Sequence, residues 1–471
     1  MRAWVKSIPQ IGRSCSAWPY RRVAKHAATT VRFNRVADTK ALPGFVPCHR
    51  FGTNPQPFQH LKQGRLSLLA LLAAAATGVS IGSLSALSET DVDSRNNESA
   101  TATTDQKQKK SERRKGMPVT TSNFFYYSAK DVPTAEMMKD VILFTGNSNK
   151  DLAEEVAGYL NLKLSDSTVG SFNDGETSVR LKEGCRGKEI YIIQSLCSGK
   201  IDAEDGQKEK KISVNDSLME LLLMASAAQR ASGSRITAVI PYFAYARQSR
   251  KIGKARVPIA AADLAKMMVT SGVDRIITLD VHMPEVEGAF PNSVNFTNVA
   301  TLPVGAAYFG EKHLVDPVIV GSKSAAIYRA KRFREAIADH GYPAAKLATF
   351  VKEQVAPNSW KRRLMGDSVV GRDCILVDDM IDTGTTIVKA AGRLKRAGAR
   401  RVFVFASHGI FSHNALSRIE KASQLEEVVV SNSVYCGEPT KKIKFLSLAP
   451  LIAESIRRVY QSKSTHKLTL Q

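Results

Sequence analysis

Three aspartates and three threonines fall within the nine residues 378–386, an arrangement suited to holding a sugar phosphate. The apolar run CILV ends in Asp378 and Asp379, whose carboxylates are suited to accept hydrogen bonds from sugar hydroxyls or to hold Mg²⁺. A short loop follows, and a helical pattern then begins, whose first turn offers free N–H groups and a positive dipole end to a phosphate. The loop residues are Asp382, Thr383, Gly384, Thr385 and Thr386. Helix capping by Asp and Thr would explain one or two of these residues, but not all six.

The sequence pattern of residues 141–460 predicts the strands and helices that position this loop. Short β-branched runs alternate there with longer amphipathic segments, a pattern that predicts parallel sheets covered by helices. In such sheets, ligands bind at the carboxyl ends of the strands. The pattern has twice the length of one doubly wound unit, so we expect an α/β fold with two similar doubly wound domains, at 141–295 and 296–460. After the loop, the apolar face of the expected helix comprises Ile387, Ala390, Ala391 and Leu394, and Gly398 suits its end.

Over residues 141–460 the chain resembles the ribose-phosphate pyrophosphokinases, also called PRPP synthetases. Its segment 371–384 is similar to the PRPP-binding motif that these enzymes share with type I phosphoribosyltransferases. The resemblance implies a phosphoribosyltransferase-like fold and transfer of the β,γ-diphosphoryl group of ATP to the anomeric hydroxyl of ribose 5-phosphate, giving PRPP and AMP for nucleotide biosynthesis. A phosphoribosyltransferase would leave the ATP-side segments unexplained. The other matching segments are FNDGET (172–177), PYFAYARQSRK (241–251), ARVPI (255–259), LDVH (279–282), SHGIFS (407–412) and IAESIRR (452–458).

The resemblance also implies roles for the residues at matching positions. Lys352 is expected to stabilise charge on the transferring phosphoryl group, and His282 to bind Mg²⁺. Asp378, Asp379 and the loop 382–386 are expected to bind ribose 5-phosphate. Phe172 is expected to enclose the adenine of ATP, although an ordinary core aromatic is the simpler alternative for it. The expected ATP contacts are Phe172, Asp174 and Glu176, whose segment often acts across a subunit interface, together with Arg247 and Gln248.

Two catalytic positions differ from the family pattern. Lys323 stands where the family has an aspartate that helps to bind Mg²⁺, and Gln354 stands where it has a second cation after Lys352. Two further differences lie outside these positions. Thr385 replaces a glycine of the family's phosphate loop. Residues 202–215 form a charged insertion. Losing one charge contact to a transition state costs a rate factor on the order of 10² to 10³.

Two functions are therefore open. The chain is either an active ribose-phosphate diphosphokinase or a catalytically impaired regulatory subunit of a hetero-oligomeric PRPP synthetase. In the first case, Lys323 contacting a phosphate directly would take over part of the metal's role. In both cases the resemblance implies assembly with PRPP synthetase subunits, either copies of this chain or others.

The residues before the matching region have a different composition. Residues 1–37, within a presequence-like segment 1–60, contain eight Lys or Arg and no acidic residue. This is typical of an organellar transit peptide, although a basic tail without a targeting role has the same composition. Within the following segment 61–135, residues 66–88 carry no charge and are long enough to span a bilayer, and a polar linker follows. They predict either a membrane anchor or part of a cleaved presequence, in a mitochondrion or plastid, with the cytoplasm as the alternative.

The net charge of +23 does not by itself indicate a nucleic-acid partner, and we expect none. Residues 1–135 hold 20 Lys and Arg against 8 Asp and Glu, a net charge of +12. The remaining excess suits phosphate-rich small ligands. The six cysteines are scattered and include no CxxC pair, so neither a zinc site nor a disulfide framework is expected.

Overall fold

The computed structural model describes residues 135–201, 210–251, 253–356, 359–435, 440–466 and 468. All of them belong to one compact unit, Ser88–Gln471. The expected presequence (1–60) and the expected anchor and linker (61–135, up to residue 134) lie outside the described residues. Among the helices that the structure describes, none is long and apolar enough to cross a membrane.

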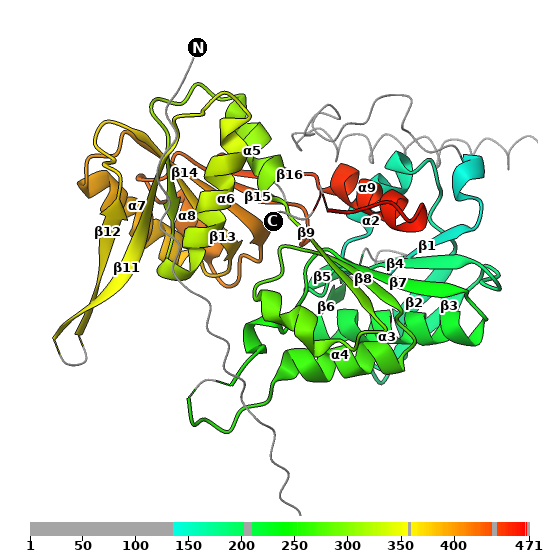
Figure 1. Cartoon of the computed structure of the whole chain (residues 1–471). Helices are drawn as coiled ribbons and strands as arrows, with labels where there is room; N and C mark the ends of the chain where they lie inside the picture. Colours follow the sequence, from blue (N-terminus) through cyan, green and yellow to red (C-terminus); the bar gives the residue numbers. More distant parts are fainter. Residues whose placement is uncertain are drawn as a thin grey trace, which may run out of the picture. The chain divides into compact units, whose positions relative to one another are not determined.

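The first half of the described chain is built on a five-stranded parallel sheet, here the first sheet, with the strand order β1-β4-β7-β8-β9. Helices α3 and α4 cover one face and α2 covers the other (Figure 1). Because both faces are covered, β1, β4, β7 and β8 are mostly apolar and buried, whereas the edge strand β9 includes polar residues. The elements are β1 (Val141–Thr145), α2 (Lys150–Tyr159), β4 (Glu189–Ile193), α3 (Val214–Arg230), β7 (Arg235–Ile240), α4 (Ala260–Thr270), β8 (Arg275–Leu279) and β9 (Asn295–Val299).

Two antiparallel hairpins are inserted into this half. The first joins β2 (Ser167–Ser171) to β3 (Thr177–Leu181), and its turn carries the FNDGE segment. The second joins β5 (Gly199–Ile201) to β6 (Lys210–Ile212). Strand β6 and the first residues of α3 belong to the charged insertion 202–215. A short 3-10 helix, η5 (Ala246–Gln248), follows the end of β7.

The second half is built on a seven-stranded sheet, here the second sheet, with the order β12-β11-β10-β13-β14-β15-β16. All neighbouring strands are parallel except β12, which forms a long antiparallel hairpin with β11. The chain extends the sheet to one side of β10 and then to the other, and such a reversal opens a crevice at the carboxyl ends of the strands. The strands are β10 (Val318–Gly321), β11 (Lys346–Ala356), β12 (Ser359–Gly366), β13 (Asp373–Ile381), β14 (Arg401–Gly409), β15 (Glu427–Ser431) and β16 (Ile443–Leu446).

Helices cover both faces of the second sheet, so the expected α/β fold with two similar parallel-sheet units is confirmed. Helices α5 (Leu302–Gly310) and α6 (Ile327–Ala338) pack on one face, and α7 (Thr385–Arg396) and α8 (Ala415–Glu420) on the other. The buried residues of α7 are the four expected from the sequence, and Gly398 has the left-handed backbone (φ 90°) that ends the helix.

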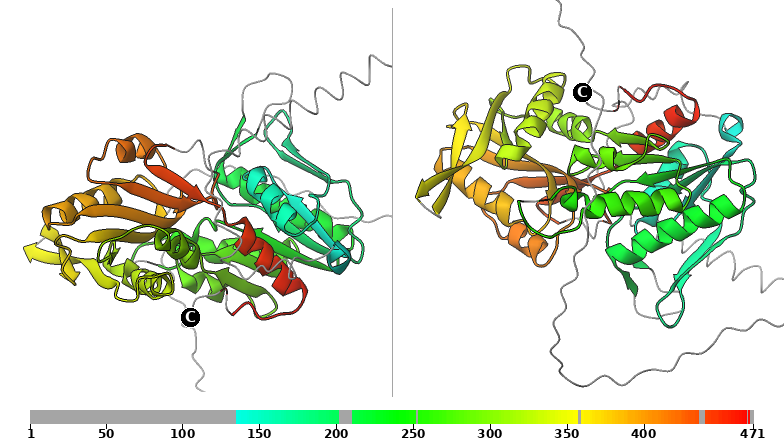
Figure 2. Two further views of the ribbon diagram at one scale, coloured as in Figure 1. Left: turned by 90° about the horizontal axis from the view of Figure 1, so that it is seen from above. Right: turned by 60° about the horizontal axis from the view of Figure 1, so that its bottom comes forward.

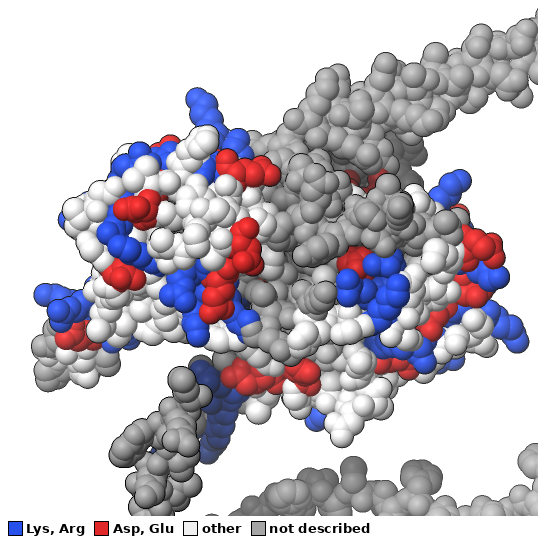
Figure 3. Space-filling model, turned by 45° about the horizontal axis from the view of Figure 1, so that its top comes forward, with Lys and Arg blue, Asp and Glu red and all other residues white. Residues whose placement is uncertain are grey.

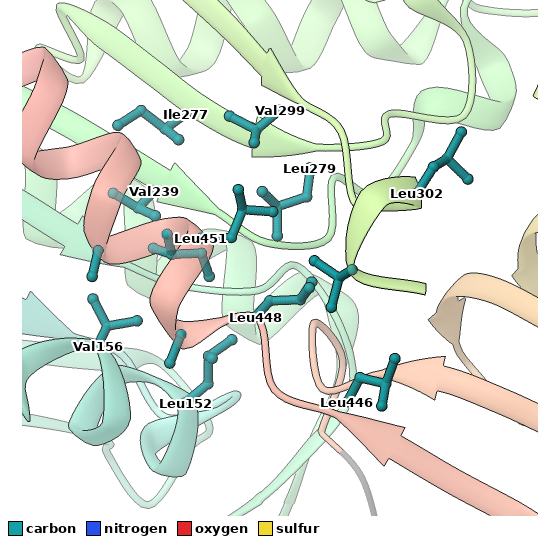
Figure 4. Close-up of a cluster of buried hydrophobic side chains, with 14 of the residues drawn as sticks. Leu152, Val156, Val239, Ile277, Leu279, Val299, Leu302, Leu446, Leu448 and Leu451 are labelled. Atoms are coloured by element: carbon teal, nitrogen blue, oxygen red, sulfur yellow. The ribbon is translucent and has the colours of Figure 1, made fainter. Parts of the chain in front are cut away.

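The two sheets share one apolar core. The C-terminal helix α9 (Ala449–Tyr460) follows β16, the last strand of the second sheet, but packs against α2 on the first sheet (Figure 2). Leu448 and Leu451 lie between α2 and the strands of the first sheet (Figure 4), in a buried cluster that continues to Phe405 of the second. Residues 449–460 therefore pack with the first sheet, although the sequence groups them with residues 296–460.

Candidate active site

The loop between β13 and α7 forms a ligand cradle at the centre of the second sheet. Asp378 and Asp379, near the end of β13, are each only 4% exposed. Gly384 has φ 72° and caps α7, so the first turn of the helix faces the cavity at the end of β13 with unpaired N–H groups. A side chain at this left-handed position would be strained, which explains the glycine.

Lys323 projects its ammonium group onto the two buried aspartates. It follows β10, the strand paired with β13, so the ends of both strands meet. Its Nζ lies 3.1 Å from Asp378 Oδ1 and 3.5 Å from Asp379 Oδ1. Burial by itself would lower the pKa of Lys323, but the two carboxylates outweigh it and raise that pKa above its usual value.

His282, after the end of β8 in the first sheet, contacts the same pair. Its Nδ1 hydrogen-bonds to Asp379 Oδ2. Burial opposes ionisation of both aspartates, but the hydrogen bond with His282 and the charge of Lys323 lower the pKa of Asp379. At Asp378, burial and the neighbouring Asp379 together raise the pKa. The pair therefore combines one firmly ionised carboxylate with one that resists ionisation.

A buried polar network holds the end of β8 in place behind His282. Asp280 Oδ2 accepts hydrogen bonds from Thr301 Oγ1 and from Ser407 Oγ, the latter at 2.7 Å. Arg329 of α6 lies with its Nη1 3.3 Å from Asp280 Oδ1. Since Asp280 precedes His282 by two residues, this network fixes the position from which the imidazole reaches Asp379.

Arg247 closes the site from the first sheet. It lies in η5, and its Nη1 forms an ion pair with Asp382 Oδ2 at 2.7 Å. Burial works against both charges. At Asp382, hydrogen bonds with Ser412 and Arg247 outweigh burial and lower the pKa. At Arg247, the hydrogen bond with Asp382 outweighs burial and the pKa is raised. A cavity of about 230 Å³ lies among Arg247, His282, Lys323, Asp378 and the loop.

A second, strongly basic cavity of about 340 Å³ adjoins the first. The two share Arg362 and Thr386 as lining residues. Its wall is formed by α7 and the β11–β12 hairpin, and none of the described residues that line it is acidic. The cationic lining residues are Lys352, Lys361, Arg362, Lys389 and Arg393. An array of cations beside Thr385 and Thr386 is suited to hold a polyphosphate.

Arg362 is the most informative residue that the sequence did not identify. It pairs in register with Lys352 across the hairpin, and paired residues in an antiparallel ladder share a face. Its Nη1 lies 3.5 Å from the carbonyl oxygen of Ser322, which places it beside Lys323. The sequence signals the hairpin only through the turn-forming pair Pro357-Asn358. Regular pairing from Ala356 and Ser359 would place Arg363 opposite Lys352, and the register shift between Gln354 and Ala356 places Arg362 there instead.

The hairpin carrying Phe172, Asp174 and Glu176 is not brought to these cavities within the chain. All three residues are exposed, Phe172 by 59%. The turn is closed by hydrogen bonds from Phe172 N to Glu176 O (2.8 Å) and from Gly175 N to Phe172 O (3.0 Å). This exposure excludes the core alternative for Phe172. Gln248 is also exposed and lines neither cavity.

Surface charge is mixed on one face of the molecule. On the face shown in Figure 3, basic and acidic side chains lie next to one another over the described residues.

Comparisons with known proteins agree along the chain. The family described as the N-terminal domain of ribose phosphate pyrophosphokinase matches residues 141–272. The family described as phosphoribosyl synthetase-associated domain matches residues 314–469.

Individual relatives cover the same region. The ribose-phosphate pyrophosphokinase of Vibrio cholerae is 41% identical over 331 residues, covering 69% of this chain and 98% of the relative. That of Haemophilus ducreyi is 40% identical over 332 residues, with the same coverage. The crystal structure of phosphoribosylpyrophosphate synthetase from Mycobacterium smegmatis matches with a TM-score of 0.59 and 31% identity, covering 69% of this chain and 99% of that one.

Proposed function

Because this chain belongs to the ribose-phosphate pyrophosphokinase family, we propose that the cavity at Asp378 and Asp379 binds ribose 5-phosphate and that the adjoining basic cavity binds the diphosphoryl group of ATP. The chain is a ribose-phosphate diphosphokinase. The anomeric oxygen of the sugar attacks the β-phosphorus of ATP and loses its proton. The bond between that phosphorus and the α,β-bridging oxygen breaks, and AMP leaves with that oxygen.

The sugar side of the proposal rests on the β13–α7 loop. The 5-phosphate binds the N–H groups of the first turn of α7 and the hydroxyls of Thr383, Thr385 and Thr386. The ribose hydroxyls donate to Asp378 and Asp379, since each carboxylate oxygen can accept more than one hydrogen bond. The juxtaposition of buried carboxylates and a phosphate-binding helix start is the observation that carries this assignment.

The nucleotide side rests on the basic cavity. Lys352 and Arg362 face it from the paired strands of the hairpin and neutralise charge on the transferring group, so that Arg362 replaces the cation absent at Gln354. Arg247 contacts the nucleotide phosphates from η5. Gln248 and the exposed segment of Phe172, Asp174 and Glu176 contact the adenosine, the latter from a neighbouring subunit.

Magnesium enters the proposal as the counter-ion of ATP. Within the described ranges, no group of three or more His, Cys, Asp or Glu side chains is arranged to hold a metal ion. His282, Asp378 and Asp379 are close together, but their oxygens and Nδ1 contact one another and Lys323. These residues do not fit a protein-bound divalent ion at the aspartate pair. His282 remains a predicted ligand for the Mg²⁺ that accompanies ATP.

The test is AMP release by the purified chain with Mg²⁺ and ATP, with and without ribose 5-phosphate. We expect release that depends on ribose 5-phosphate at a rate on the order of 1–100 per second. Absence of AMP under these conditions would contradict catalysis by the isolated chain.

The regulatory-subunit alternative is favoured by one observation, the ion pair of Lys323 with both aspartates. It predicts that the chain co-purifies with a second synthetase chain that has an aspartate at the position of Lys323, and that it changes the activity of that chain. Full activity in homo-oligomers alone would exclude this alternative.

The proposal extends to the assembly of the chain and to its location in the cell. The chain forms oligomers with PRPP synthetase subunits, which bring the Phe172 turn to a neighbouring ATP site. Residues 1–60 direct the chain to a mitochondrion or plastid, and residues 66–88 anchor it in a membrane there. Fractionation of cells expressing the full chain or a form lacking residues 1–88 tests both statements, because only the full chain should sediment with organellar membranes.

A further inference from the structure

The position of Lys323 is fixed by the sheet. Gly321 pairs with Val377 at the end of the parallel β10–β13 ladder, and the next residue, Ser322, donates its N–H to the Val377 carbonyl oxygen at 3.4 Å. Ser322 is fully buried and donates a hydrogen bond from Oγ to Asp378 Oδ2. Lys323 has an extended backbone (φ −156°, ψ 164°) and its side chain is 37% exposed. Its ammonium therefore reaches the aspartates from an anchored strand end.

Each of the four carboxylate oxygens of the pair has a partner in the protein. Asp378 Oδ1 contacts Lys323 Nζ at 3.1 Å and accepts the Asp379 N–H at 3.0 Å, while Oδ2 accepts from Ser322. Asp379 Oδ1 contacts Lys323 Nζ at 3.5 Å, and Oδ2 contacts His282 Nδ1. A Mg²⁺ ion requires near-octahedral oxygen ligands at about 2.0–2.1 Å and retains several waters. It would have to displace the ammonium, because the two cations would compete for the same oxygens.

The ammonium also accounts for the charge balance of the pair. Two adjacent buried carboxylates repel each other, and a buried charge without a partner is strongly destabilising. The Lys323 ammonium, which contacts Oδ1 of each aspartate, offsets this repulsion without any added ion. Of its three N–H donors, the aspartates engage two, so the third can donate to a ligand oxygen in the cavity that Lys323 lines.

We propose that Lys323 is a built-in cation that replaces a divalent ion at the Asp378–Asp379 pair, so that this chain binds the hydroxyls of its sugar phosphate without a metal there. This inference rests on the proposed function. The ammonium of Lys323 then balances the charge of the aspartates on the sugar side of the site. A divalent ion is needed only on the nucleotide side, by the polyphosphate.

Two measurements on the full chain test the proposal. The first is calorimetric titration of ribose 5-phosphate in EDTA and in Mg²⁺, where we expect dissociation constants that agree within about twofold. The second is titration of the ligand-free chain with Mn²⁺, followed by electron paramagnetic resonance. We expect no stoichiometric Mn²⁺ site in the wild type and a new site in Lys323→Asp, whose ribose 5-phosphate affinity should then rise at least tenfold with Mg²⁺.

Control variants separate a local effect from a general change of charge. Lys331→Asp makes the same charge reversal on α6 at a residue whose side chain is 56% exposed, and it should leave both titrations unchanged. Lys323→Met removes the ammonium without adding a ligand, and it should weaken ribose 5-phosphate binding in EDTA by about tenfold or more. This result, together with the wild-type titrations, keeps the proposal testable if Lys323→Asp does not fold.

The outcomes also distinguish this inference from the proposed function. A stoichiometric Mn²⁺ site in the ligand-free wild type, or binding of ribose 5-phosphate only with Mg²⁺, would overturn the built-in cation. Absence of ribose 5-phosphate binding under every condition would instead overturn the sugar-phosphate assignment. In that case the Mn²⁺ titrations of the wild type and Lys323→Asp would still decide whether the ammonium excludes a metal.

Discussion

Arg247 and Asp382 join the two sheets at the ligand site, with 2.7 Å between Nη1 and Oδ2. The arginine belongs to η5 beside the first sheet and the aspartate to the phosphate loop of the second. Because the guanidinium has five donors, it can keep this ion pair while it binds a phosphate oxygen. The pair therefore connects the expected nucleotide side of the site to the sugar side.

The first prediction concerns this arginine. Arg247→Ala should lower ribose 5-phosphate-dependent AMP release by a factor on the order of 10² to 10³, because a charge contact to the phosphoryl groups is lost. Arg372→Ala is the matched control, since Arg372 lies beside the amino end of β13, lines neither cavity, and donates from Nη1 to the Ser368 carbonyl oxygen at 3.2 Å. Equal rates for the two variants would show that Arg247 does not act in the transfer.

The second prediction concerns the helix that returns to the first sheet. Leu451 of α9 is 1% exposed within the core that both sheets share (Figure 4). Leu451→Ala should reduce the free energy of unfolding by about 2–5 kcal/mol, because it removes buried methyl groups and leaves a cavity. Leu416→Ala on α8, where the side chain is 38% exposed, should change it by about 0.5 kcal/mol or less. Urea denaturation of both variants checks this, and a similar loss in both would contradict the role of α9 in the core.

The third prediction concerns acid stability. Asp373 is fully buried at the start of β13 and accepts paired hydrogen bonds from Arg400 (2.9 and 2.6 Å) and Arg401 (3.1 and 2.7 Å). Burial opposes its charge, but the two arginines outweigh burial and lower its pKa to about 2. A lowered carboxyl pKa stabilises the fold above the unfolded-state pKa of about 4. That contribution is lost as the pH falls from about 4 through about 2.

Asp373→Asn should therefore cost about 2 kcal/mol at pH 7, and its difference from the wild type should shrink below pH 4. Urea denaturation at pH 7 and at pH 3 measures both effects. Asp263→Asn, at an exposed position of α4, serves as the control for loss of a surface carboxylate. A difference between Asp373→Asn and the wild type that stays constant between pH 7 and pH 3 would contradict the lowered pKa.

The fold was largely predictable because the relevant signals are local. The apolar face of α7 follows from the spacing of Ile387, Ala390 and Leu394, and its end follows from Gly398. The return of α9 to the first sheet was not predictable in this way. Its amphipathic pattern specifies a buried face, but nothing local in Leu448 or Leu451 specifies which sheet covers that face.

The site was predictable in part, for the same reason. The strand ends bring together His282, Asp379 and the phosphate loop, as the resemblance implies. The contact of Lys323 with both carboxylates depends on the register between β10 and β13. That register cannot be predicted from Lys323 and its neighbours in the sequence. Arg362 reaches the site only through the pairing of β11 with β12.

Arg362 carries the last prediction, because the basic cavity offers a direct comparison with its neighbour. Arg362 lines both cavities and pairs with Lys352, whereas Arg363 is exposed, pairs with Val351 and lines neither. If Arg362 replaces the cation absent at Gln354, Arg362→Ala should lower kcat for AMP release on the order of 10²-fold or more. Arg363→Ala removes the same charge from the next residue and should leave kcat unchanged.

A rescue variant sharpens this comparison. Gln354→Arg restores a cation two residues after Lys352, on the same strand β11. Placed in the Arg362→Ala background, it should recover at least tenfold of the lost kcat, because a transition-state charge contact is worth that much or more. Recovery would show that the two positions supply one function from opposite strands of the hairpin. No recovery, combined with a loss in Arg363→Ala as large as that in Arg362→Ala, would mean that the hairpin acts through its overall charge and that Arg362 has no specific role.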